Sequence, residues 1–173
     1  VSVTTFSGEV TSSVGPLRSA RMAPNLLNFL DGTHQRANEG STNILAAARS
    51  IAARRHKGTV VLISDLMADN REETLRTLAA ARVRTAVLHV LSPQERNPGI
   101  GDEVTLIDSE TGQEFNTQIN RQMTNAYVAR LEAFTQELKD ICNRYGFAFI
   151  DITSDASIEQ LMIGDLRKGG LVR

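Results

Sequence analysis

The chain has 173 residues, which is enough for one domain with a substantial core, and we expect a single domain over residues 1–173. Its 19 basic and 20 acidic residues nearly cancel, which argues against bulk attraction to nucleic acid or to anionic lipid. A single cysteine excludes an internal disulfide framework and is typical of a reducing compartment, so we expect a cytoplasmic location.

No apolar run approaches the ~20 residues that a membrane span needs. The chain opens at Val1 without a methionine, so we expect it to be truncated at its N-terminus. Membrane tethering by upstream segments therefore stays open.

The first third of the chain predicts one hairpin and two helices. Residues Val1–Phe6 and Val10–Val14 are expected to form an antiparallel hairpin at the edge of a sheet. A brief helix is expected around residues 26–30, with Pro24 at its start and Gly32 past its end. A clearer helix is expected over residues 43–56, where apolar residues recur at helical spacing.

The next stretch, TVVLISD, predicts the central strand. Val60–Ile63 is an unbroken apolar run, which is typical of a strand covered on both faces in a parallel sheet. It ends at Ser64 and Asp65, and open α/β sheets place ligands just past the carboxyl ends of their strands. Asp65 could instead cap the following helix.

That following helix, however, has its own cap candidates. Asp69 or Asn70 could begin it, with Glu72 and Glu73 placed for a capping box. Asp65 is then not needed as a helix cap, which favours a functional role for its carboxylate.

Geometry predicts a partner for Asp65. The helix over residues 43–56 and the strand over residues 59–64 are each ~20 Å long, and only a short turn separates them. They must run antiparallel, so Thr42 and Asp65 are expected at the same rim. A hydroxyl and a carboxylate are oxygen ligands that suit Mg²⁺, with Ser41 and Ser64 as secondary candidates. Ser41 or Thr42 is also the natural N-cap of the helix, and both interpretations stay open.

The remainder predicts an α/β fold. Apolar strands at residues 85–91 and 147–152 alternate with helices, which indicates βαβ units and a mostly parallel, three-layer sheet structure with helices on both faces. His89, inside a strand, is expected to be a satisfied interior histidine. We also expect a helix at 71–82 and a hairpin at 103–117. A long helix is expected at 121–145, where it packs on the sheet or forms a coiled-coil seam. The last helix is expected to run from Ser154 or Asp155 to Leu166, and Gly169 and Gly170 close it.

This element order, with G-S-T-N opening a helix and VVLISD as a strand, resembles a von Willebrand factor type A domain, which has a Rossmann-like fold. There, G-G-T and a strand-ending Asp supply two of the three loops of a metal ion-dependent adhesion site. Thr42 and Asp65 match those positions, with Ser41 replacing the second glycine. The segments LHVLSPQE, LIDSETG and LRKGGLV are similar to the bacterial von Willebrand A–like family called domain of unknown function 58. Its members are commonly linked to MoxR-type AAA+ ATPases.

The third loop of the resembled site, D-x-S-x-S, is not found in the chain. In such domains it follows the first and central strand, so we expect this chain to lack that strand and its loop. Two outcomes are then expected for the sheet. The N-terminal hairpin pairs directly with the strand over residues 59–64, or a gap remains between them.

The sequence therefore predicts a protein-interaction module with an incomplete divalent-metal site at Thr42 and Asp65, working with a MoxR-type AAA+ ATPase. The alternative is a Mg²⁺-dependent phosphoryl-transfer enzyme that uses Asp65. Two further acids converging on Asp65 would favour the enzyme, and a shallow, open rim would favour the binding module.

Overall fold

A parallel three-stranded sheet forms the centre of the fold. The computed structural model describes residues 1–6, 10–34, 43–54, 58–99, 103–107, 114–118, 121–168 and 170–171. Its main sheet has the order β3–β4–β7, with β3 at Thr59–Ser64, β4 at Arg84–Leu91 and β7 at Ala148–Thr153. Both pairings are parallel, with Leu62 opposite Val87 and Leu88 opposite Ile150. The α/β, Rossmann-like fold expected from the sequence is confirmed.

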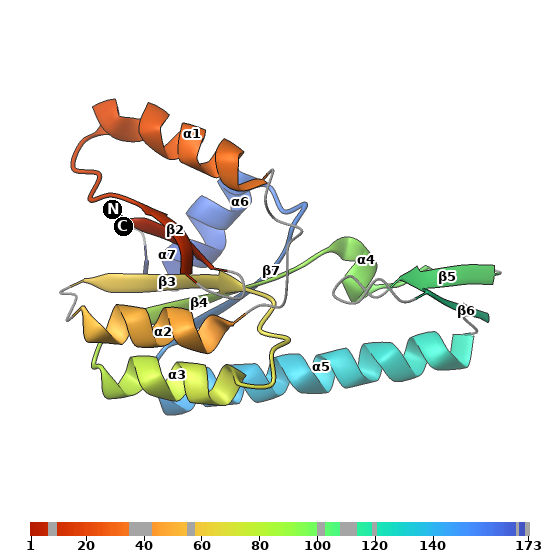
Figure 1. Ribbon diagram of the computed structural model, residues 1–173. Helices are drawn as coiled ribbons and strands as arrows, with labels where there is room; N and C mark the ends of the chain where they lie inside the picture. The colour runs from red at the N-terminus through yellow and green to blue at the C-terminus, as the bar shows by residue number, and fades with distance from the viewer. Residues whose placement is uncertain are drawn as a thin grey trace.

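One face of this sheet is covered by three helices. Figure 1 shows α2 (Ile44–Ala53), α3 (Arg71–Ala80) and α5 (Arg121–Arg144) along the same side of β3, β4 and β7. The main hydrophobic core lies here, and its members include Leu62, Leu75, Val87 and Leu138. The single cysteine, Cys142, is fully buried in this core, and burial raises the pKa of its thiol to about 12.

The other face of the sheet is covered more loosely. Figure 1 shows there α1 (Ala23–His34), the hairpin of β1 (Val3–Phe6) and β2 (Val10–Val14), and the C-terminal helical segment, residues 158–168. Large apolar side chains of this layer are exposed, among them Leu27 at 61% and Ile163 at 72%. The short helical turns are η1 (Ala20–Met22), α6 (Ile158–Gln160), the π-helical η2 (Leu161–Asp165) and α7 (Leu166–Lys168).

The expectation that the central strand is covered on both faces is wrong for β3. Leu62 is buried under the helices, but Val61 and Ile63 on the opposite face are 47% and 59% exposed. The physical reason is position, because β3 lies at an edge of the sheet and the loose layer leaves these side chains to solvent. The strand that is buried on both faces is β4, where Thr85 to His89 are all buried.

The N-terminal hairpin is confirmed as a hairpin but not as part of the main sheet. β1 pairs antiparallel with β2, with Val3 opposite Val14, and together they form a separate two-stranded sheet. Within the described residues neither strand pairs with β3. Of the two outcomes expected for this region, the gap is therefore the one observed.

A second hairpin extends the molecule to one side. β5 (Glu103–Ile107) and β6 (Glu114–Gln118) pair antiparallel, as the sequence predicted for residues 103–117, and the predicted turn between them lies outside the described residues. Figure 1 shows this hairpin, together with α4 (Pro93–Arg96) and the first half of α5, beyond the end of the sheet. The second half of α5 packs against the sheet through Leu138 and Ile141.

The predicted starts of α3 at Arg71 and α5 at Arg121 are confirmed, whereas the caps of α2 and of the last helix differ from the predictions. α2 is capped by Asn43, whose Oδ1 accepts the Ala46 N–H at 3.1 Å, so the predicted cap at Ser41 or Thr42 is wrong. Asn70 occupies the N-cap position of α3, as one of the two predictions has it, but its side chain makes no cap bond and the predicted capping box is absent. The last helix begins at Ile158, because the Ser154 N–H still donates to Leu91 O at 2.9 Å and extends the pairing of β7 with β4.

The helix ends also shift. α1 runs through Gly32 to His34, and the Thr33 hydroxyl donates to Phe29 O at 2.7 Å. A glycine inside a helix costs about 1 kcal/mol relative to alanine, which this helix tolerates. α2 ends at Ala53, earlier than predicted. The C-terminal segment closes on Gly170, which has a φ of 69°, and the Leu171 N–H returns to Leu166 O at 2.9 Å. Gly169 lies outside the described residues.

The two layers are packed unequally, so shortening a side chain to alanine should change the free energy of unfolding more in one layer than in the other. Leu138→Ala removes a fully buried side chain from the core and should lower the free energy of unfolding by about 2–5 kcal/mol. Leu27→Ala shortens a side chain of the same type that is 61% exposed. It should change the free energy of unfolding by less than about 0.5 kcal/mol. Urea unfolding followed by circular dichroism measures both, and equal losses would contradict this division of the fold.

Candidate functional site

The end of β3 is shaped by a buried leucine with an unusual backbone. Leu66 has a φ of 56°, in the left-handed region, yet its side chain is fully buried in the main core. A left-handed conformation costs a residue with a side chain roughly 1–2 kcal/mol, and it persists only where the surroundings enforce it. Burial of Leu66 supplies that enforcement. The chain therefore turns sharply here, with Leu66 inside and the neighbouring Asp65 and Met67 exposed.

Two local hydrogen bonds fix this turn. The Ser64 hydroxyl oxygen accepts the Leu66 N–H at 3.0 Å, and Asp65 Oδ1 accepts the Met67 N–H at 3.1 Å. Within the described residues the second carboxylate oxygen, Asp65 Oδ2, has no hydrogen-bond partner. Asp65 is therefore not a helix cap. It is an exposed carboxylate, held by one oxygen and without a partner among the described residues at the other.

Large apolar side chains are exposed close to Asp65 in sequence. Ile63 is 59% exposed, Met67 is 47% exposed, and Val61 lies two residues before Ile63 on the same face of β3. We call Val61, Ile63, Asp65 and Met67 the β3 rim. Large exposed apolar groups beside a polar one are typical of surfaces that bind other proteins.

The start of α2 lies at the same end of the sheet. Figure 1 shows α2 and β3 running in opposite directions, so the N-terminus of α2 and the carboxyl end of β3 share one side. Asn43 stands there as the helix cap. The predicted site residues Thr42 and Ser41 lie outside the described residues, so their approach to Asp65 stays a prediction.

The described residues fit a divalent ion only in part. Asp65 Oδ2, which accepts no hydrogen bond from a described residue, is one hard oxygen ligand, and Mg²⁺ uses few protein ligands and keeps several waters. Ser64 is less suitable, because its hydroxyl is already engaged by the Leu66 N–H and lies 3.5 Å from Asp65 Oδ1. In the described part of the chain, no three His, Cys, Asp or Glu side chains are grouped as a metal site would require.

A second polar cluster, which the sequence reasoning missed, joins β4, α4 and β7. His89 is fully buried, and its Nδ1 lies 2.8 Å from Asp151 Oδ1. An ionised carboxylate only accepts hydrogen bonds, so Nδ1 carries the proton. Arg96 donates to Asp151 Oδ1 at 2.5 Å and to Ile152 O at 3.1 Å. The interior position predicted for His89 is confirmed, although its Nε2 has no partner among the described residues.

This cluster stands beside a groove between α5 and β7. The groove has a volume of about 400 Å³, and Arg96 and Asp151 belong to its lining. Phe149, also in the lining, stacks on His89 with ring centroids 5.7 Å apart. No spacing rule could have found this cluster, because 62 residues separate His89 from Asp151 and only the pairing of β4 with β7 joins them.

One of three comparisons with known proteins found a match. A family model with the description "Protein of unknown function DUF58" matches residues 1–137. A search of the curated proteins and a search of the solved structures found no match. Within the described residues, no helix is both long enough and apolar enough to cross a membrane.

The cluster of His89, Arg96 and Asp151 predicts that the stability of the fold depends on pH. Burial alone would raise the pKa of Asp151, but hydrogen bonds from His89 and Arg96 and the charge of Arg96 lower it below its usual value. A lowered pKa means that the ionised carboxylate stabilises the fold at neutral pH, and that this contribution is lost as the pH falls through the folded-state pKa.

Asp151→Asn should therefore lower the free energy of unfolding at pH 7 by about 1.5–3 kcal/mol, the usual contribution of hydrogen bonds to a charged group. The difference from the parent protein should shrink as the pH falls below about 4, where free aspartate becomes protonated. Urea unfolding between pH 3 and pH 7 measures it, with the exposed Asp155→Asn as the matched control. A difference that stays constant over this range would refute the charged role of Asp151.

Proposed function

We propose a function for this chain as a member of the DUF58 family, to which the match over residues 1–137 shows that it belongs. It is a protein-binding module, and the β3 rim is its binding surface. The observation that carries this proposal is the exposed carboxylate of Asp65, whose Oδ2 has no partner in the described part of the chain, close to the exposed side chains of Ile63 and Met67.

The chemistry of the rim supports binding through one charged group and its apolar neighbours. Protein interfaces combine buried apolar contacts with a small number of oriented polar groups. The rim offers both, since Ile63 and Met67 present apolar area and the buried Leu66 holds the turn that carries Asp65 outward. An anchored turn of this kind loses little conformational freedom when a partner binds, which favours affinity.

A divalent cation is part of the proposal. Asp65 Oδ2 would hold it, with the Thr42 hydroxyl as the second protein ligand expected from the sequence and Ser41 and Ser64 in supporting positions. When bound, such an ion would link the rim to a carboxylate of the partner protein. The partner that the sequence resemblance implies is an AAA+ ATPase of the MoxR type.

Phosphoryl transfer through Asp65 is the competing function. A phosphoryl-transfer site needs several charged groups that surround the transferred group and stabilise its negative charge. The rim is open, since Asp65, Ile63 and Met67 are all exposed, and this openness favours the binding module.

The proposal predicts that Asp65→Ala weakens binding to a purified MoxR-type AAA+ ATPase by about tenfold or more in the presence of Mg²⁺. Removal of Mg²⁺ with a chelator should weaken binding of the parent protein to the ATPase to a similar extent. The thermal midpoint should shift by only about 1–2 °C, because Asp65 is exposed and substitutions at such positions change stability little. Isothermal titration calorimetry and thermal unfolding measure the two effects.

Asp69→Ala is the matched control, since Asp69 is an exposed aspartate four residues along the chain. It should leave both Mg²⁺ dependence and affinity unchanged. Tight binding that is indifferent to Mg²⁺ and to Asp65→Ala would refute the rim as the binding surface. Mg²⁺-dependent phosphate release that disappears in Asp65→Ala would establish the enzymatic alternative.

A further inference from the structure

A second surface with binding character lies on the opposite edge of the sheet. β7 pairs with β4 along one edge, and within the described residues no strand pairs with its other edge. The groove of about 400 Å³ runs between β7 and α5, on the side away from β3. An open strand edge next to a helix-walled groove is the arrangement in which extended peptides add to a sheet.

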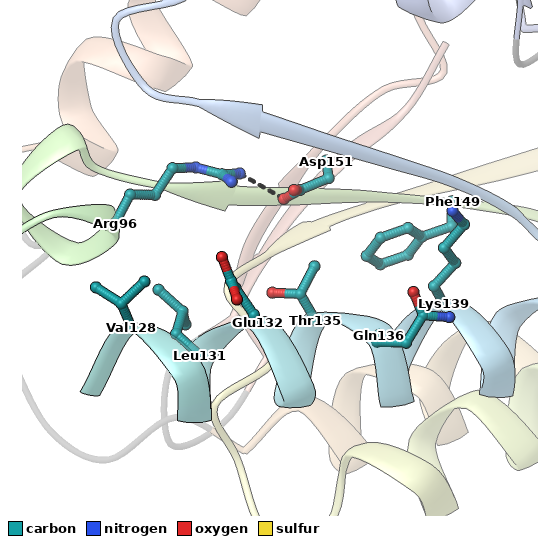
Figure 2. A pocket seen from close by; sticks show the side chains of 9 residues that line it. All are labelled: Arg96, Val128, Leu131, Glu132, Thr135, Gln136, Lys139, Phe149 and Asp151. Carbon is teal, nitrogen blue, oxygen red and sulfur yellow. Dashed lines mark hydrogen bonds and ion pairs between the residues drawn. The ribbon is translucent and has the colours of Figure 1, made fainter. Parts of the chain in front are cut away.

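The walls of this groove differ in character. Figure 2 shows Phe149 and Asp151 on the β7 wall, and Leu131, Glu132 and Lys139 on the α5 wall. Phe149 and Leu131 are half-buried and supply apolar surface. Asp151 is neutralised by Arg96, which donates to its carboxylate at 2.5 Å. The charges left over in the groove are therefore those of Glu132 and Lys139.

Among the described residues, the ion pairs that α5 forms lie on its α3 side. Toward α3, Glu137 of α5 pairs with Arg71 at 3.4 Å and Arg144 of α5 pairs with Glu72 at 3.5 Å. Glu132 and Lys139 have no ion-pair partner among the described residues, although both line the groove. They stand seven residues apart on the helix, about 10 Å. Side chains on one face of an extended chain are about 7 Å apart when two residues separate them along the chain and about 13 Å apart at four residues, so long side chains at such positions can reach both charges.

We propose that this groove binds an extended peptide segment of a partner protein, which adds to the free edge of β7 as a further strand. The segment carries a basic side chain that pairs with Glu132 and an acidic side chain that pairs with Lys139. An apolar side chain between them packs on Leu131 and Phe149. Backbone hydrogen bonds along β7 supply affinity, and the opposed charges fix the direction of the segment.

The experiment selects ligands without assuming a sequence. A phage-displayed library of random octapeptides is panned against the intact protein, and one selected peptide is synthesised and measured by calorimetry. Selected peptides should contain both a basic and an acidic residue. Lys139→Glu should weaken binding by about fivefold or more, because an attractive charge pair becomes repulsive. Arg130→Glu, an exposed charge reversal on the same helix outside the groove lining, should not.

Two further arms separate specific docking from general charge attraction. The double variant Glu132→Lys with Lys139→Glu keeps the net charge, and it should prefer the peptide in which the acidic and basic residues are exchanged. N-methylation of alternate peptide residues removes backbone donors in one of two registers. It should abolish binding in the register that faces β7 and spare the other, because an added strand uses every second residue for pairing.

The proposal is overturned if no peptide is selected, if Arg130→Glu and Lys139→Glu weaken binding equally, or if both N-methylated registers bind alike. Asp65→Ala should leave peptide binding unchanged, so this test is independent of the function proposed for the β3 rim.

Discussion

Parallel pairing along both edges of β4 is the constraint on which the rest of this structure depends. β3 and β7 each pair in register with β4, and parallel strands can be joined only by crossovers that return the chain across a face of the sheet. The helices between the strands are therefore placed on the faces, and the carboxyl ends of all three strands lie at one end of the sheet. Asp65 follows β3 at this end, and α4 with its Arg96 follows β4 there.

The two faces of the sheet differ in how well they are covered, and this difference determines which side chains of β3 are exposed. The face under α2, α3 and α5 holds the main core, including Leu66, whose burial enforces the turn after β3. The opposite face leaves Val61 and Ile63 exposed. The well-packed layer thus fixes the backbone of β3, while the loosely packed layer leaves part of its surface exposed.

Much of the fold could be predicted because its strands are defined by local composition. The run Thr59–Ser64 was bounded correctly, since an uninterrupted apolar segment between Gly58 and Asp65 permits little else. The starts of α3 and α5 are predictable, but the caps of α2 and of the last helix are not, because several Ser, Thr, Asp and Asn residues compete locally and tertiary pairing selects among them. Ser154 is one example, since its N–H is used to extend the sheet and cannot begin a helix.

The positions of candidate site residues can be predicted from the sequence only where the order of elements along the chain determines them. The exposed position of Asp65 past β3 follows from the end of an apolar strand, whereas the exposure of Ile63 depends on which strand lies at the edge, a property of the whole sheet. Arg96 and Asp151 could not be linked in advance, because 55 residues separate them and a partly buried ion pair leaves no periodic signal.

Hydrogen exchange of the chain, free and bound to a purified MoxR-type AAA+ ATPase in Mg²⁺, tests the central claim most directly. The rim proposal predicts slower exchange in peptides that cover residues 61–70 on binding, with peptides of the α5–β7 groove unchanged. Protection confined to residues 128–139 and 148–153, with no change around Asp65, would contradict it.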